Sequence, residues 1–245
     1  MKKTRKSIIR GGLCVWLLLT VGCGVLPVTK RIHGERIRVQ RVFQDNFASM
    51  DKWVNPNPAA KWRVKNEKLY GNWAPGGSTL WCKRNFESDL YIEFAARLCP
   101  PEEEWLKEKQ SEGGKNLSLR FLVTGPLGED ILTVYRKLAE EATGPNRNGD
   151  DQYRGYFFTW THTHARLRRS PGYEKVGEDV EFVPEINRFY EVSLLKRGGR
   201  IKFWIDGKLI HEYQDDHPFD YGKIGFDLFM SNVEISDLRV YQVLP

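Results

Sequence analysis

The chain has 245 residues, of which 40% are hydrophobic, 13% aromatic and 29% charged, with 22 Gly and 12 Pro. This composition excludes collagen-like, coiled-coil and multi-pass membrane proteins. The formal net charge is +6, but residues 1–22 hold five of the 38 basic residues and no acid, which leaves 33 basic against 32 acidic residues. The remaining chain is therefore almost neutral, and a nucleic-acid partner is not expected.

The first 22 residues have the pattern of a secretory signal peptide. A basic segment at 1–10 precedes an apolar run at 13–21, LCVWLLLTV. That run is about half the ~20 residues that a membrane-spanning helix needs. Small residues follow it, as they do at a signal-peptide cleavage site. We therefore expect residues 1–22 to be removed on export.

The tetrapeptide Thr20-Val21-Gly22-Cys23 resembles a bacterial lipobox, although its first residue is Thr where the pattern prefers Leu. The resemblance implies acylation of Cys23 and a lipid anchor in the bacterial cell envelope, at the outer membrane in a double-membrane bacterium. The alternative is an ordinary signal peptide with a chance cysteine. We expect a polar, lipidated tether at 23–40, with His33 in solvent, followed by one domain at 41–245.

From residue 41 onward, short segments rich in β-branched and aromatic residues alternate with turn signals, which is typical of strands. Asp206-Gly207 predicts a tight hairpin. The charged segment 100–114 and the helically spaced segment 130–144 each predict a short helical insertion. Together these patterns predict an all-β fold, a two-sheet antiparallel sandwich. The expected strands lie at 41–47, 61–73, 78–86, 89–98, 117–125, 153–162, 188–199, 200–213, 221–230 and 232–243.

Two cysteines, Cys82 and Cys99, remain beyond the signal and lipobox segments. An exported protein can form a disulfide between them. Both can instead be buried thiols in neighbouring strands, because Cys packs well as a small apolar residue. The sequence leaves both alternatives open.

Three stretches resemble concanavalin A-like (LamG-type) jelly-roll domains: FQDNFASMDKWVNPNPAAKWRVKNEKLYGNW at 43–73, GGRIKFWIDGKLIHEY at 198–213 and GKIGFDLFMSNVEISDLRVYQV at 222–243. The segment GYFFTWTHTHARLRRSPGY, at 155–173, is similar to uncharacterised bacterial exported domains. A more distant similarity is to the 3-keto-disaccharide hydrolase-like family. The resemblance implies a jelly roll whose concave sheet meets carbohydrate.

One motif of related enzymes is missing from this sequence. Laminarinase-type jelly rolls carry E-x-D-x-x-E along one strand, which directs the carboxylates of a retaining glycosidase into the groove. No segment of the chain has that spacing. Retaining hydrolysis of the laminarinase type is therefore disfavoured.

The strongest candidate site lies along a strand that begins near residue 153. If that strand continues without a turn, alternate residues share one face. An aromatic ring can stack on a sugar, Arg can bind a carboxylate or sulfate, and His can transfer a proton near neutral pH. We predict catalytic roles for His162 and His164. Predicted substrate-binding residues are Tyr156, Trp160, Arg166 and Arg168, together with Arg120 and Trp73.

Other interpretations of the same residues stay open. The aromatic residues can pack in the core, and the arginines can form a solvated face. The two histidines can also be metal ligands, although the sequence offers no third ligand. Separately, Asp45 and Asp237 lie on the expected first and last strands, where related jelly rolls hold a structural calcium ion. Turn and cap chemistry is the alternative for these two aspartates.

Two functions are compatible with these patterns. The first is a hydrolase or lyase in polysaccharide utilisation that acts on an oligo- or polysaccharide with acidic or modified sugars. The second is a non-catalytic glycan-binding or structural surface lipoprotein. Either function takes carbohydrate as its ligand, and we expect a monomer.

Overall fold

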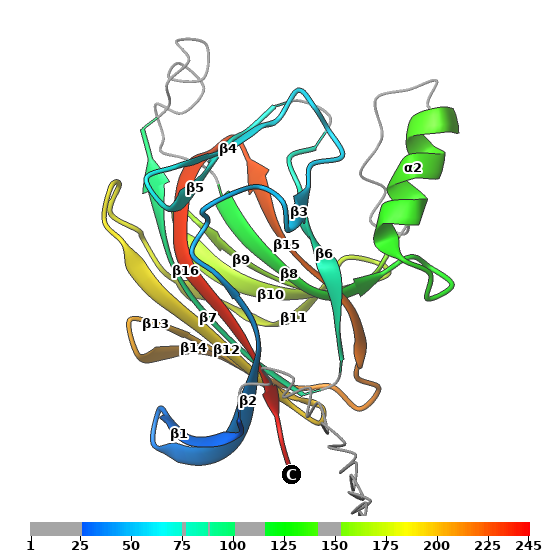
Figure 1. Ribbon diagram of the computed structural model, residues 1–245. Helices are drawn as coiled ribbons and strands as arrows, with labels where there is room; N and C mark the ends of the chain where they lie inside the picture. Colours follow the sequence, from blue (N-terminus) through cyan, green and yellow to red (C-terminus); the bar gives the residue numbers. More distant parts are fainter. Residues whose placement is uncertain (1–25, 75–76, 88, 101–115, 142–152) are drawn as a thin grey trace, which may run out of the picture.

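The computed structural model describes residues 26–74, 77–87, 89–100, 116–141 and 153–245. These residues form two antiparallel sheets that lie face to face, with the hydrophobic core between them (Figure 1). The two-sheet antiparallel sandwich expected from the sequence is therefore confirmed.

The nine-stranded sheet contains both the first and the last strand of the described chain. Its order is β1-β2-β16-β7-β12-β13-β14, and β4 joins it through β5, which pairs with β16. Its strands are β1 (Val28–Ile32), β2 (Glu35–Asp45), β4 (Lys61–Lys65), β5 (Lys68–Asn72), β7 (Leu90–Cys99), β12 (Tyr190–Arg197), β13 (Arg200–Ile205), β14 (Lys208–Gln214) and β16 (Asn232–Val243).

The seven-stranded sheet has the order β11-β10-β9-β8-β15-β6-β3. Its strands are β3 (Trp53–Val54), β6 (Leu80–Glu87), β8 (Asn116–Thr124), β9 (Arg154–Thr161), β10 (His164–Ser170), β11 (Glu174–Glu181) and β15 (Tyr221–Phe229). The helix α2 (Ile131–Glu141) follows β8 and confirms the helix expected at 130–144. The helix expected at 100–114 falls almost entirely outside the described residues.

Alternation of side chains along the strands builds the core. In β7, Ile92 and Phe94 are buried between the sheets, whereas Glu93 faces outward. The two sheets meet through aromatic rings, as where Phe158 of β9 stacks on Phe203 of β13 with ring centroids 4.0 Å apart. Burial of these apolar side chains is the main force that holds the sheets together.

Residues 28–40 differ from the expected tether, because they form β1 and the first half of β2. Ile32, Ile37 and Val39 of this hairpin are buried in a small cluster on the outer face of the nine-stranded sheet. His33, in the turn, is not simply solvated: its ring stacks on Trp204 with centroids 4.3 Å apart. The many charged residues of this segment concealed its alternating apolar positions.

The two cysteines form no disulfide. Cys82 lies in the seven-stranded sheet and Cys99 at the end of β7 in the other sheet. Burial raises the pKa of the Cys82 thiol to about 11, so the thiol stays protonated and unreactive at neutral pH.

In the described part of the chain, no helix is long and apolar enough to cross a membrane.

Candidate functional site

A row of polar side chains crosses the outer face of the seven-stranded sheet, perpendicular to the strands. Strand register places Asp227 opposite Ser118, Ser118 opposite Thr159, and Thr159 opposite Arg166. Each of these residues alternates with core residues, and so it points away from the other sheet. Thr79, which precedes β6, and Asp179 of β11 extend this set at its two ends. We call the whole set the polar row; its members are Thr79, Asp227, Ser118, Thr159, Arg166 and Asp179.

Hydrogen bonds link neighbouring members of the polar row. The Thr79 hydroxyl donates to Oδ1 of Asp227 over 2.8 Å, and the Ser118 and Thr159 hydroxyls are 2.8 Å apart. At the far end, Nη2 of Arg166 donates to Oδ2 of Asp179 over 2.7 Å. Mutual bonding fixes the positions of these groups before any ligand arrives.

Arg120 of β8 lies beside the polar row and binds the carboxylate of Asp227. Its Nη2 donates to Oδ2 of Asp227 over 2.8 Å, and only 9% of its side chain is exposed. The guanidinium also lies 4.9 Å from the Tyr153 ring and 5.0 Å from the Phe157 ring. Nε and Nη1 of Arg120 have no hydrogen-bond acceptor among the described residues. Two buried donors are thus left for an additional acceptor.

Aromatic side chains border the polar row on both sides. On one side, Trp81 packs against Tyr135 of α2 with ring centroids 6.0 Å apart. On the other side, Phe229 at the end of β15 pairs with Asn116 and contacts Trp73 with centroids 5.8 Å apart. Phe229 is 48% exposed, so this side offers a ring surface to a ligand.

The two histidines predicted as catalytic residues lie at the turn between β9 and β10. Nδ1 of His164 is 2.9 Å from the Thr163 hydroxyl, and its Nε2 is 3.9 Å from Oδ2 of Asp179. Burial and the nearby Arg166 guanidinium lower the pKa of His164, so its imidazole is neutral at pH 7. His162 is half-buried in the same turn.

The predicted single face through Trp160 and the histidines does not form, because the chain turns at 162–163. The turn pairs Trp160 with Ala165, and this odd separation puts Trp160 and Arg166 on opposite faces. Trp160 is 2% exposed in the core. Tyr156 is buried there as well and donates to Oδ2 of Asp215 over 2.5 Å. Neither aromatic residue can contact a ligand in the folded protein, which corrects their predicted binding role.

The three predicted arginines lie on the outer face of the seven-stranded sheet. Arg168 lies opposite Phe157, with its guanidinium 4.0 Å from the Tyr173 ring, and its Nη1 donates to the Tyr173 carbonyl. The structure therefore places four of the eight sequence-predicted residues on the outer face, namely Arg120, His164, Arg166 and Arg168. His162 lies in the turn, and Trp73 follows β5 of the other sheet, where it packs against the core and contacts Phe229.

The two aspartates predicted to hold calcium have different environments. Asp45 is 2% exposed, and its carboxylate accepts hydrogen bonds from Nε1 of Trp53 at 2.7 Å and from the Phe47 amide at 2.9 Å. Asp237 is exposed and lies 3.7 Å from Arg239. Because N–H donors already occupy Asp45, the calcium interpretation is replaced by turn chemistry. Among the described residues, no group of three His, Cys, Asp or Glu could hold a metal ion.

Sequence reasoning missed the neutral part of the polar row. The alternating polar residues of β8 in N-L-S-L-R, namely Asn116, Ser118 and Arg120, were the available signal. Asp227 and Asp179 gave no local signal, because their importance depends on pairing with arginines distant in sequence.

No family model and no curated protein matches the chain. Among solved structures, the chain is similar to a protein of unknown function with a galectin-like fold from Bacillus subtilis, with a TM-score of 0.65 and 16% identity over 89% of this chain and 99% of that one. It is also similar to the carbohydrate binding module CBM66 from Bacillus subtilis, with a TM-score of 0.53 and 14% identity over 76% and 93% of the two chains. A third similar structure is the endo-beta-1,3-glucanase from Pyrococcus furiosus, with a TM-score of 0.52 and 13% identity over 89% and 99%. These likenesses confirm the expected concanavalin A-like jelly-roll fold.

Proposed function

We propose that the outer face of the seven-stranded sheet binds an oligo- or polysaccharide that carries acidic groups. The observation that supports this proposal is the polar row, with Arg120 buried at its centre and Phe229 exposed at its border. The partly exposed side chains of Asp227, Arg166 and Asp179 offer carboxylate and guanidinium groups to the hydroxyls of a sugar. The hydroxyl residues of the row are 4–5% exposed and hold these groups in position. The ring surface beside them suits the apolar face of a pyranose.

The preference for an acidic sugar follows from the arginines. Arg166 is 24% exposed, and its partner Asp179 also lies within ion-pair distance of Lys175 and near His164. The two charged side chains, Arg166 and Lys175, exceed the single carboxylate of Asp179 and leave positive charge for a ligand carboxylate or sulfate. Arg binds such groups in bidentate geometry.

Binding is favoured over hydrolysis by the state of the two carboxylates. Asp227 is held by Arg120 and Asp179 by Arg166. A retaining glycosidase needs two carboxyl groups about 5–5.5 Å apart that are available to the substrate. Guanidinium partners occupy both aspartates, and so this face suits a binding protein.

The test is isothermal titration calorimetry of the purified protein with polygalacturonate, a sulfated glucan and neutral dextran. We expect Arg166→Ala to weaken polygalacturonate binding about tenfold, because a charged hydrogen bond is lost, and to leave dextran binding unchanged. Arg200→Ala is the matched control, since Arg200 is also exposed and paired, with Glu212, but lies on β13 of the other sheet. Equal weakening of all three polymers by Arg166→Ala would contradict the acidic-glycan proposal.

A second candidate function is elimination chemistry on a uronic acid, and it is supported by His164. A neutral imidazole beside a guanidinium supplies a base and charge neutralisation, which elimination requires. Mass spectrometry of polygalacturonate after incubation with the protein separates binding from elimination, because only elimination gives a product. That product also lacks the water that hydrolysis would add. In the lyase case, His164→Ala abolishes the product and retains binding. If no polymer gives a product, only the binding function stands.

We also propose that Cys23 carries lipid and anchors the exported protein to the cell envelope. The support is the lipobox-like tetrapeptide that follows the apolar run. Metabolic labelling with palmitate in a bacterial host tests this proposal. Label in the unmodified chain that is absent from Cys23→Ser is the expected result, and equal label in both would contradict it.

A further inference from the structure

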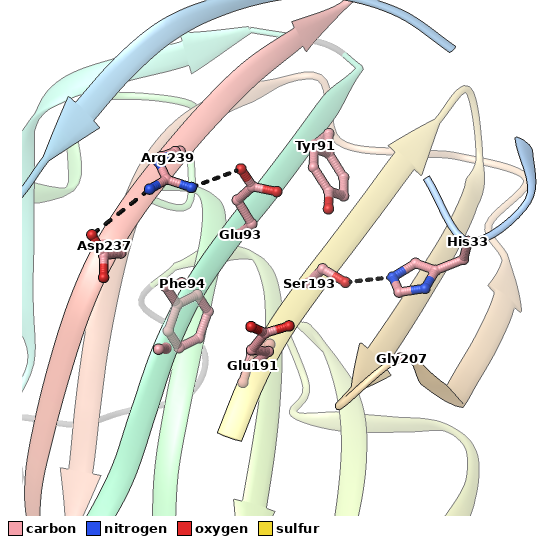
Figure 2. Close-up of a pocket in the computed structure, with 11 residues that line it drawn as sticks. His33, Tyr91, Glu93, Phe94, Glu191, Ser193, Gly207, Asp237 and Arg239 are labelled. Atoms are coloured by element: carbon pink, nitrogen blue, oxygen red, sulfur yellow. Dashed lines mark hydrogen bonds and ion pairs between the residues drawn. The ribbon is translucent and has the colours of Figure 1, made fainter. Parts of the chain in front are cut away.

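A separate cleft of about 310 Å³ opens on the outer face of the nine-stranded sheet (Figure 2). Strand register places Glu93 of β7 between Arg239 of β16 and Ser193 of β12. One step along the strands, Ala95 lies opposite Glu191. Because Ala95 carries only a methyl group, the longer side chains around it leave a hollow. The volume is at the lower end of the range for ligand pockets, ~300–1,000 Å³, and suits a ligand of one ring.

The β1–β2 hairpin forms one wall of the cleft. In its turn, Nε2 of His33 is 2.9 Å from the Ser193 hydroxyl (Figure 2), and the ring stacks on Trp204. Lys30 of β1 bonds both oxygens of Glu93 at 2.7 and 2.6 Å, and it lies 4.4 Å from the Tyr241 ring. These contacts hold the hairpin against the sheet, so the wall is ordered without a ligand.

The charges in and around the cleft do not cancel. Glu93, Glu191 and Asp237 are acidic, whereas Lys30 and Arg239 are basic, which leaves one negative charge. Burial lowers the pKa of His33, so His33 adds no positive charge at pH 7.

The excess charge is located at the open side of the cleft. Glu93 is already bound by Lys30 and by the Tyr241 hydroxyl at 2.9 Å. Glu191 is exposed, and its carboxylate makes no bond to the other residues drawn in Figure 2. Among the described residues, the one ion pair of Asp237 is its 3.7 Å contact with Arg239. Glu191 and Asp237 therefore keep acceptor capacity for a ligand.

We propose that this cleft binds a monosaccharide-sized ligand with a protonated amine, such as an amino sugar whose nitrogen is not acetylated. The ammonium group donates to Glu191 and Asp237, and the Ser193 hydroxyl bonds a ring hydroxyl. A charged donor on carboxylate acceptors gives a stronger hydrogen bond than a neutral donor. This ligand class differs from the acidic glycan proposed for the other sheet, and the cleft does not depend on that proposal.

The experiment titrates the full purified chain with glucosamine, N-acetylglucosamine and glucose by isothermal titration calorimetry near pH 6.5, where the free amine is protonated. The three sugars share a ring and differ in the charged group. We expect glucosamine to bind at least about tenfold more tightly than the other two. We also expect Glu191→Gln to lower the affinity for glucosamine about tenfold, to that of the two uncharged sugars.

Two variants serve as controls. Glu87→Gln removes an exposed glutamate from β6 in the other sheet and should leave glucosamine binding unchanged, although it alters the net charge equally. Arg166→Ala should also leave it unchanged, because Arg166 lies on the other sheet. Thermal unfolding of each variant checks that it is folded. The proposal would be overturned if the three sugars bound equally or if glucosamine did not bind. It would also be overturned if Glu191→Gln bound glucosamine as tightly as the unmodified protein, or if Arg166→Ala weakened glucosamine binding.

Discussion

Two pairs of charged residues on the outer faces of the sandwich have opposite environments. On the seven-stranded sheet, Arg120 and Asp227 are 9% and 19% exposed and satisfy one another within the row. On the nine-stranded sheet, Lys30 from the edge hairpin neutralises Glu93, whereas Glu191 and Asp237 remain exposed. The Arg120–Asp227 pair is built into the folded structure, whereas Glu191 and Asp237 are available to solvent. Substitutions should therefore affect stability at the first pair and mainly ligand binding at the second.

The largest expected effect is on the seven-stranded sheet. Asp227→Ala leaves the Arg120 guanidinium buried without its carboxylate, and breaking such a pair costs about 3 kcal/mol of unfolding free energy. Urea denaturation measures this loss. Glu191→Ala is the matched change on the other face and should stay within about 0.5 kcal/mol of the unmodified protein. Similar losses for both variants would remove the contrast between the faces.

An intermediate effect is expected at the hairpin wall of the cleft. His33→Ala removes one hydrogen bond and one stacked ring pair, which together contribute about 1–2 kcal/mol. Hydrogen exchange measures the outcome, because amide protection should fall in β1 and the start of β2 and remain in β8. His217→Ala changes an exposed residue between β14 and β15 and should leave protection unchanged in both β1 and β8. Unchanged protection of β1 in His33→Ala would show that the hairpin is held without His33.

The smallest expected effect is on the loss of stability at acidic pH. Burial alone would raise the pKa of Glu93, but hydrogen bonds and charge from Lys30 and the Tyr241 hydroxyl hold it below its ordinary value of 4.5. The unfolded chain therefore takes up this proton first, and the stabilisation present above pH 4.5 is lost as the pH falls through the lower, folded-state pKa. Denaturation at several pH values should show a shallower acid loss in Glu93→Gln than in the unmodified protein. A Glu93→Gln slope equal to that of Glu87→Gln would contradict this assignment.

Most of the fold was predictable because the chemistry is local. In β7, Leu90, Ile92 and Phe94 recur at every second position, which sets strand, register and buried face at once. The Asp206-Gly207 turn forms where expected, with both residues at positive φ. Such signals depend only on side chains within a few residues of one another.

The errors at the site arose where a local signal was weak. The turn at His162–Thr163 contains neither Gly, Pro nor Asn, so the strand pattern continues through it in sequence. Residues before and after the turn are then assigned to one face although they lie on opposite faces. Likewise, the Arg120–Asp227 pair joins residues 107 positions apart. Partners at that separation become evident only after the strand order is known.

The edge position of β1 has a mechanical consequence. Among the described strands, β1 pairs only with β2, from Val28 opposite Val39 to Ile32 opposite Glu35. A pulling force applied at residue 26 therefore loads these pairs one after another, from the open end of the hairpin toward its turn, and leaves the core sheets unloaded. Peeling β1 away separates Lys30 from Glu93 before it reaches His33. Tension on the N-terminal side would thus dismantle one wall of the cleft while the polar row on the opposite sheet stays intact.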